Sequence, residues 1–232
     1  MKWNGKVASM LATTVAALFF MGKTPQNTQA ANNNDKKIID VSEWQYDIDW
    51  AKVAPQINLA ILRTQYGSED NSDYKLDDRY AENVAGAKAN KVPFGSYMFS
   101  EFASVQDAKN AADSFYKHAD KASKFYVLDD EKRAGSDPEQ DYINAWVQEM
   151  RTLTKKKLVL YTYTSYQQEN NLDASQFDGK WIANYQSNPG TDTADLWQYS
   201  SDGHLDGIDQ AKVDVNLANN NTVRGWYSTK KS

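Results

Sequence analysis

The sequence predicts an α/β fold in which five β/α units are followed by three further strands. Apolar, strand-like runs alternate with helix-like segments up to about residue 163, and three more such runs then follow at short spacing. Alternation of this kind favours parallel strands that are joined by right-handed crossovers. Eight strands are enough to close a barrel, and an open α/β sheet is the alternative.

The predicted elements come in a regular order along the chain. Strand-like runs occupy residues 38–41, 59–64, 93–99, 125–129 and 158–163, and helix-like segments cover 50–53, 77–90, 104–118 and 137–154. Ser104 is placed to cap the third of these helices, and Asp137-Pro138 begins the fourth. The remaining strand-like runs, at 181–184, 195–199 and 212–215, lie too close together for full helical crossovers between them.

Residues 1–31 have the layout of a secretory signal peptide. Lys2 and Lys6 precede an apolar run over residues 7–21, and small and polar residues then lead to Ala30-Ala31. The run is shorter than the about 20 residues that span a bilayer. We therefore expect cleavage near Ala31 and no stable membrane span afterwards, with a retained N-terminal anchor as the alternative.

The rest of the chain divides into a short polar leader, residues 32–36, and one domain, residues 37–232. No internal repeat, low-complexity tract or Pro/Gly-rich linker interrupts this domain. There are no cysteines. An exported domain without disulfides depends on its hydrophobic core, and about 200 residues suffice for one good core.

The composition excludes several classes of function. The formal net charge is −5, and loss of the signal would remove three lysines and no acidic residue. This acidity argues against nucleic acid as a partner. With no cysteine and only His118 and His204, the sequence predicts neither a thiol nucleophile nor a Ser-His-Asp site, and no metal or other cofactor.

Two carboxylates lie close together at the end of the fourth strand-like run. Asp129 and Glu131 are two residues apart, so they share one face of a strand while Asp130 faces the other way. Neighbouring carboxylates resist simultaneous ionisation, which raises the pKa of one of them. A protonated acid beside an ionised carboxylate is what cleavage of a glycosidic bond requires, although such a pair at a solvated loop end is common.

Two more acids strengthen this interpretation. Asp40 closes the first strand and Asp214 lies in the last one. The carboxyl ends of strands in a parallel β/α barrel converge on one mouth, and the first and eighth strands are neighbours when the barrel is closed. We therefore expect all four acids at one rim. Trp and Tyr are also numerous, at 7 and 14 residues, and such rings stack on sugars.

Seven sequence blocks also occur in the order of a known family. They are Asp40-Val41-Ser42-x-Trp44-Gln45, Ala60-Ile61-Leu62-Arg63-Thr64-Gln65-Tyr66-Gly67, Gly95-Ser96-Tyr97-Met98-Phe99, Val127-Leu128-Asp129-Asp130-Glu131, Trp181-Ile182-Ala183-Asn184-Tyr185, Leu196-Trp197-Gln198-Tyr199-Ser200 and Val213-Asp214-Val215-Asn216. By these blocks the chain resembles the family 25 glycoside hydrolases, the muramidases of phage endolysins and bacterial autolysins. The family pattern differs at Gln65-Tyr66, where some members carry a carboxylate, and at Met98, where many have His.

The resemblance implies a flattened, TIM-like barrel with a catalytic role for residues 37–232. It implies hydrolysis of the β-1,4 bond between N-acetylmuramic acid and N-acetylglucosamine in peptidoglycan. Glu131 would be the general acid, and Asp129 would orient the substrate's 2-acetamido group as an internal nucleophile. Asp40 and Asp214 would shape the electrostatics of the floor and hold the other two acids in place.

The resemblance also suggests a substrate groove and a place of action. The aromatic residues expected to bind substrate are Tyr97, Phe99, Tyr161, Trp181, Tyr185 and Trp197, the last of which could equally belong to the core. The expected partners are peptidoglycan glycan strands. We expect a monomer that is secreted into the extracellular space and associated with the cell wall.

Two other functions remain open from the sequence. Since a fold does not determine function, the same barrel could be a non-catalytic protein that binds cell-wall saccharides. A chitinase-like hydrolase is the second alternative. The segment Asp206-Gly207-Ile208-Asp209 resembles the start of a chitinase signature, but the D-x-E ending of that signature is absent.

Overall fold

The computed structural model describes residues 36–69 and 71–228. The predicted signal peptide over residues 1–31 lies outside the described residues, as does all of the polar leader except Lys36. Within the described part, no helix combines the length and the apolar character needed to cross a membrane.

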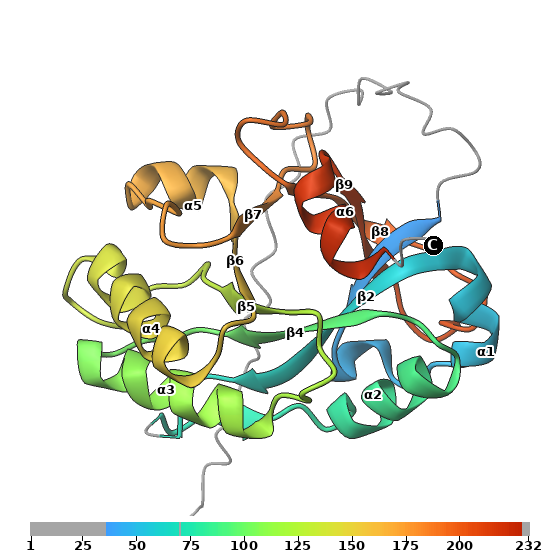
Figure 1. The fold of residues 1–232 in the computed structure, drawn as a ribbon, viewed down its shortest axis with the longest axis horizontal. Coiled ribbons are helices and arrows are strands. Elements are labelled where there is room, and N and C mark those ends of the chain that lie inside the picture. The colour runs from blue at the N-terminus through green and yellow to red at the C-terminus, as the bar shows by residue number, and fades with distance from the viewer. Residues whose placement is uncertain (1–35, 70, 229–232) are drawn as a thin grey trace, which may run out of the picture. The chain divides into compact units, whose positions relative to one another are not determined.

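Eight strands form a closed barrel (Figure 1), in the order β1-β9-β8-β7-β6-β5-β4-β2, with β1 also paired to β2. The strands are β1 (Lys37–Val41), β2 (Ile57–Tyr66), β4 (Phe94–Phe99), β5 (Phe125–Asp129), β6 (Lys157–Tyr163), β7 (Gly179–Ala183), β8 (Leu196–Gly203) and β9 (Val213–Ala218). The short strand β3 (Lys75–Leu76) pairs with the end of β2 outside the barrel. The predicted α/β barrel is therefore confirmed.

A helical segment follows each of the first five barrel strands. The helices are α1 (Trp50–Val53), α2 (Tyr80–Ala89), α3 (Val105–His118), α4 (Glu139–Leu153) and α5 (Thr164–Glu169), and the 3-10 turns η1 (Glu43–Gln45) and η2 (Ala54–Gln56) flank α1. As predicted, Ser104 caps α3, where its side chain accepts a hydrogen bond from the Asp107 amide. The long helices α3 and α4 lie side by side (Figure 1).

The last three strands differ from the first five in how they are connected. β7 and β8 pair in parallel although no helix joins them, and β9 then runs antiparallel to both β8 and β1. A further helix, α6 (Asn221–Tyr227), follows β9 and was not predicted. Its Trp226 packs on the ring of Phe125, with ring centroids 5.7 Å apart.

The barrel interior is apolar over most of its length and becomes polar at one end. A cluster that includes Leu59, Ile61, Val127 and Val159 fills it, and each of these side chains is buried. Close packing here depends on Gly95, because a Cβ at this position would lie 2.7 Å from the Phe125 ring. Two further clusters pack between the strands and the surrounding helices, so the polar end of the interior rests on a rigid support.

Candidate active site

A cavity of about 430 Å³ opens at the end of the barrel where the parallel strands finish. Asp40, Asp129, Glu131 and Asp214 all line it. Asp40 lies near the end of β1, Asp129 ends β5 and Glu131 follows two residues later. Asp214 joins them from the start of the antiparallel strand β9. The barrel thus brings four carboxylates from three strands to one site.

Asp40 and Asp214 are direct cross-strand partners in the β1–β9 pair. The buried carboxylate of Asp40 accepts hydrogen bonds from Asn216 Nδ2 at 2.7 Å and from Gln198 Nε2 at 3.2 and 3.3 Å. Burial raises the pKa of Asp40 well above its usual value, and the charge of Asp214 raises it further, against these two hydrogen bonds. Burial also raises the pKa of Asp214, to about 6.

Asp129 and Glu131 face the cavity together. Burial raises the pKa of Glu131 to about 7, with a second contribution from the charge of Asp214. The pKa of Asp129 is raised well above its usual value by burial first and then by Glu131 and Asp40. Among the described residues, nothing donates a hydrogen bond to the buried Asp129 Oδ1. This oxygen is therefore an acceptor without a protein partner.

Asp130 faces away from the cavity, as the strand alternation predicts. Its carboxylate accepts a hydrogen bond from Ser100 Oγ at 2.9 Å and is fully buried. Burial and the nearby Glu139 raise the pKa of Asp130 well above its usual value. Three consecutive residues thus place two carboxylates in the site and one in the layer behind it.

Arg63 is the one cation among the described residues that line the cavity. Its guanidinium is already engaged, because Nε donates to Asp77 Oδ2 and Nη2 donates to Glu43 Oε1, both at 2.8 Å. The four cavity carboxylates therefore have little positive charge to offset their burial, which is the main cause of their raised pKa values. The sequence signal that could have singled out Arg63 is a basic residue directly after the apolar run 59–62 of β2.

Five of the six predicted aromatic residues line the cavity: Tyr97, Phe99, Tyr161, Trp181 and Tyr185. The sixth, Trp197, does not line it. Along β8 its neighbour Gln198 faces the cavity, so Trp197 faces the other side. There its indole Nε1 donates to the Asn184 carbonyl at 2.7 Å, and its ring packs against Tyr199.

Several cavity residues were not predicted as site residues from the sequence, among them Trp44, Tyr66 and Gln198. Trp44 lines the cavity although its side chain is 62% exposed, and it belongs to the first block of the family resemblance. Tyr66 stacks on Phe99 with ring centroids 4.8 Å apart. Gln198 accepts hydrogen bonds from the hydroxyls of Tyr161 and Tyr185, at 3.0 and 2.8 Å, while it donates to Asp40. It therefore links the aromatic wall to the acidic floor.

The described part of the chain contains no group of three or more His, Cys, Asp or Glu side chains arranged to hold a metal ion. The chemistry available to the protein's own side chains is proton transfer and charge stabilisation. One carboxyl group with a pKa near neutrality beside other carboxylates suits acid-catalysed cleavage of a glycosidic bond.

Comparison with known proteins agrees with this chemistry. The model of the glycosyl hydrolases family 25 matches residues 39–208, which include Asp40, Asp129 and Glu131. The chain belongs to this family. The match ends before Asp214, which the structure nonetheless places opposite Asp40.

Proteins similar to this family 25 chain occur at low sequence identity. Uncharacterized protein YegX of Escherichia coli K12 is 27% identical over 189 residues, which are 78% of this chain and 68% of YegX. GHIP, a glycosyl hydrolase 25 of Streptococcus pneumoniae, is 26% identical and superposes with a TM-score of 0.75, over 83% of this chain and 93% of GHIP. The modular autolysin LytC of Streptococcus pneumoniae, solved with a synthetic peptidoglycan ligand, is 27% identical with a TM-score of 0.65, over 78% of this chain and 46% of LytC.

Proposed function

We propose that this family 25 member is an N-acetylmuramidase, a lysozyme that cleaves the β-1,4 bond between N-acetylmuramic acid and N-acetylglucosamine in peptidoglycan. The observation that carries the proposal is the pairing of Glu131, whose pKa is about 7, with the buried, unpartnered oxygen of Asp129 in one cavity. The peptidoglycan ligand bound by LytC supports the choice of substrate.

In the proposed reaction, Glu131 donates its proton to the glycosidic oxygen as the bond to the anomeric carbon breaks. Asp129 Oδ1 accepts the N–H of the muramic acid 2-acetamido group, and the carbonyl oxygen of that group attacks the anomeric carbon. Glu131, now ionised, then takes a proton from a water molecule that opens the cyclic intermediate. Two displacements at the same carbon restore the original configuration, so the proposal predicts retention.

Asp40 and Asp214 act on this pair through charge. Burial, and then the charge of Asp214, raise the pKa of Glu131 and so favour its protonated form near neutral pH. Asp40 lies among the same carboxylates, and its field favours the positive charge that develops at the sugar ring. Their proposed roles are electrostatic and require no contact with the bond that breaks.

Product analysis tests the proposed activity directly. Purified peptidoglycan would be treated with the protein, reduced with borohydride and analysed by mass spectrometry. We expect new reducing ends on N-acetylmuramic acid. Reducing ends on N-acetylglucosamine would contradict the assigned bond. Turnover of chitin oligomers would favour the chitinase-like alternative, and binding without new ends would favour the saccharide-binding alternative.

The pH dependence of kcat/KM follows from Glu131. The general acid must be protonated, so activity should fall as the pH rises through the Glu131 pKa of about 7. Asp214→Asn removes a negative charge that raises this pKa, and the alkaline limb should therefore move to lower pH. The profile would be measured on soluble glycan fragments. Asp202→Asn, which neutralises an exposed acid, should leave the limb in place, and an unmoved limb in Asp214→Asn would contradict the coupling.

Trp44 offers a test of substrate binding at the cavity edge. Its indole is 62% exposed beside the site, so it can stack on a sugar ring without serving the core. Stacking worth about 1 kcal/mol corresponds to about a fivefold change in affinity. Trp44→Ala should therefore raise KM about fivefold with little effect on kcat or Tm, and Trp44→Phe should retain most of the affinity. A large loss of kcat at unchanged KM would contradict this role.

We also propose that the protein acts outside the cell after removal of residues 1–31. The charged start and short apolar run of this segment support export. Mass spectrometry of the protein recovered from culture medium would locate the new N-terminus, and a product that keeps residue 1 at the membrane would support the anchor instead.

A further inference from the structure

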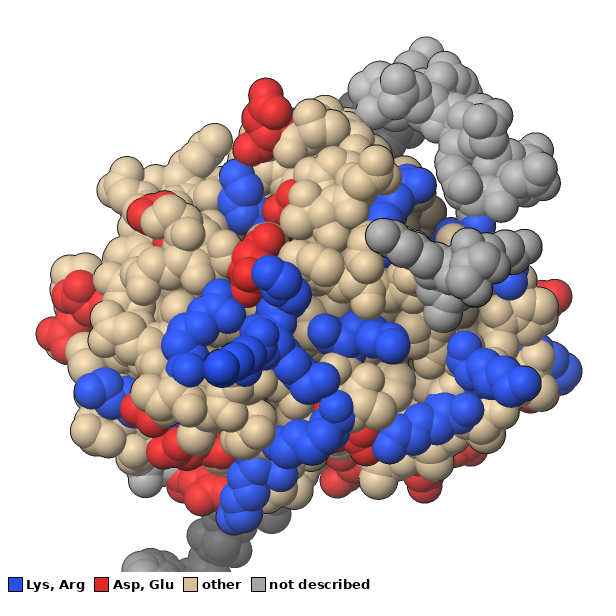
Figure 2. Space-filling view, viewed as in Figure 1, with Lys and Arg blue, Asp and Glu red and all other residues tan. Residues whose placement is uncertain are grey.

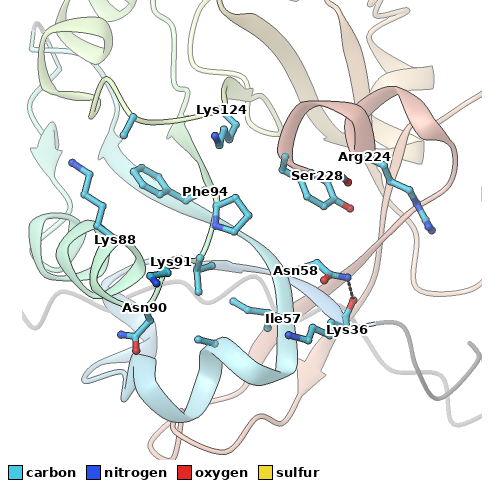
Figure 3. A pocket seen from close by; sticks show the side chains of 15 residues that line it. Lys36, Ile57, Asn58, Lys88, Asn90, Lys91, Phe94, Lys124, Arg224 and Ser228 are labelled. Carbon is cyan, nitrogen blue, oxygen red and sulfur yellow. Dashed lines mark hydrogen bonds between the residues drawn. The ribbon is translucent and has the colours of Figure 1, made fainter. Parts of the chain in front are cut away.

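A second, larger hollow lies at the other end of the barrel, where the parallel strands begin. Its volume is about 710 Å³. Lys and Arg side chains gather on the face that carries α2 and α6 (Figure 2). Those that line the hollow are Lys36, Lys88, Lys91, Lys124 and Arg224 (Figure 3), and no Asp or Glu lines it. The hollow is therefore strongly basic in a chain whose formal net charge is −5.

The fold concentrates these cations at the end opposite the active site. Lys36 and Lys124 directly precede β1 and β5, and Lys88 and Lys91 lie at the end of α2. Asp129 lies at the far end of β5 from Lys124, and five residues of strand span roughly 16 Å. The basic hollow and the acidic cavity are thus separated by the length of the barrel.

Most of the positive charge in the hollow is not neutralised by the protein. Lys88 pairs with Asp120 at 2.6 Å. Within the described ranges, no carboxylate lies within ion-pair distance of the other four cations, Lys36, Lys91, Lys124 and Arg224. All of these side chains are exposed. Four like charges that remain around one hollow attract a polyvalent anion.

The surface between the cations can also bind hydroxyl groups. Asn58 donates through Nδ2 to the Lys36 carbonyl at 3.1 Å (Figure 3), and Asn90 donates through Nδ2 to the Gly86 carbonyl at 2.9 Å. Each amide keeps its side-chain oxygen as an acceptor. Ile57 and Phe94 provide apolar floor between these polar groups. The cations can bind phosphate groups, and the amide oxygens can accept hydrogen bonds from hydroxyl groups. Together with the short apolar floor, they suit a polymer in which phosphates alternate with polyols.

The shape of this face argues against a lipid bilayer as the partner. Insertion into a bilayer needs protruding apolar side chains next to the basic residues. The large apolar side chains that are exposed in the described part are Trp44, Tyr46, Leu76, Val105, Tyr163 and Tyr185, and none of them lines the hollow. The hollow is concave, which suits a flexible polymer and not a flat membrane surface.

We propose that the basic hollow binds a linear polymer of polyol units joined by phosphodiesters, attached to the same wall that the cavity degrades. The attachment to the wall rests on the proposed muramidase function, whereas binding of the polymer does not. A polymer held at one end of the barrel would keep the acidic cavity at the other end close to glycan strands. The hollow would thus bind the wall despite the net negative charge of the chain.

The test uses the purified protein and synthetic poly(glycerol phosphate) labelled with a fluorophore. Lys91→Gln/Lys124→Gln removes two cations that have no ion-pair partner among the described residues. We expect this variant to raise the Kd about tenfold at low salt, since exposed charge pairs each contribute modestly, and to reduce the salt dependence of binding. Lys109→Gln/Lys117→Gln is the matched control, because it removes the same charge from α3 outside the hollow. It should bind as the parent does.

Several outcomes would overturn the proposal. They are equal weakening in the control variant, absence of binding by the parent, or binding of DNA or of anionic phospholipid vesicles that exceeds binding of the polymer. Hydrolysis of peptidoglycan stripped of phosphate polymers is measured in parallel, and parent and hollow variant should be equally active. A parent that binds the polymer but hydrolyses nothing would refute the muramidase and leave the binding site intact.

Discussion

Glu131→Gln should lower kcat by about 10³-fold, the typical contribution of a positioned general acid. The amide has nearly the shape of the protonated acid but cannot donate a proton to the departing oxygen. Substrate affinity should change little, because the cavity keeps its aromatic walls. The measurement is kcat and KM on soluble muropeptide oligomers, together with sedimentation of the variant with intact peptidoglycan.

A stability measurement accompanies this variant. The folded-state pKa of Glu131 is raised to about 7, so its ionisation in the folded protein destabilises the fold as the pH rises from the unfolded-state value through 7. Glu131→Gln removes this effect and should raise Tm at pH 8 but not at pH 4. Glu82→Gln makes the same chemical change on the exposed face of α2 and should leave kcat unchanged. Full activity of Glu131→Gln would refute its assignment as the acid.

Asp129→Asn should lower kcat by about 10²-fold to 10³-fold, the range observed when one group that stabilises a transition-state charge is removed. The free oxygen of Asp129 is buried and lacks a protein partner. An amide at this position can still accept the substrate N–H, but it no longer balances the positive charge that develops on the acetamido group. Single-turnover kinetics would separate this loss from any change in binding.

Intact mass spectrometry distinguishes assistance by the substrate's acetamido group from nucleophilic attack by Asp129. If the substrate supplies the nucleophile, intact mass spectrometry of parent protein quenched during turnover should show no saccharide adduct. An adduct on Asp129 would contradict the proposed role and identify a covalent intermediate. Asp78→Asn, at an exposed carboxylate, serves as the matched control and should retain the parent kcat.

The sequence predicted those features of the site that depend on local periodicity. Strand alternation correctly separated Asp129 and Glu131 from Asp130, because side-chain direction in a strand depends only on position. The same alternation places Trp197, next to the inward-facing Gln198, on the outer side of β8. The presence of an aromatic residue in a sequence block does not tell which face of the strand its side chain occupies. The register of the strand does.

The sequence did not predict features that depend on contacts between distant segments of the chain. Arg63 is held by Asp77 and Glu43 from two other segments, so its ion pairs with residues other than the four acids are visible only in three dimensions. The helix α6 is short, and it packs through Trp226 on Phe125, at the start of β5. Its stability comes from this tertiary contact and not from its own helical propensity.

The closure of the barrel determines when the enzyme can become active. Asn216 of β9 donates a hydrogen bond to Asp40 of β1 across 176 residues of sequence, and Asp214 reaches its place opposite Asp40 only through this pairing. Contacts of such long range can form only once both segments of the chain are present, and closing the loop between them costs conformational entropy. The acidic centre is therefore incomplete until β9 has been synthesised and has paired with β1. A muramidase built in this way, as proposed above, would be inactive during its own synthesis, which would spare the cell that makes it.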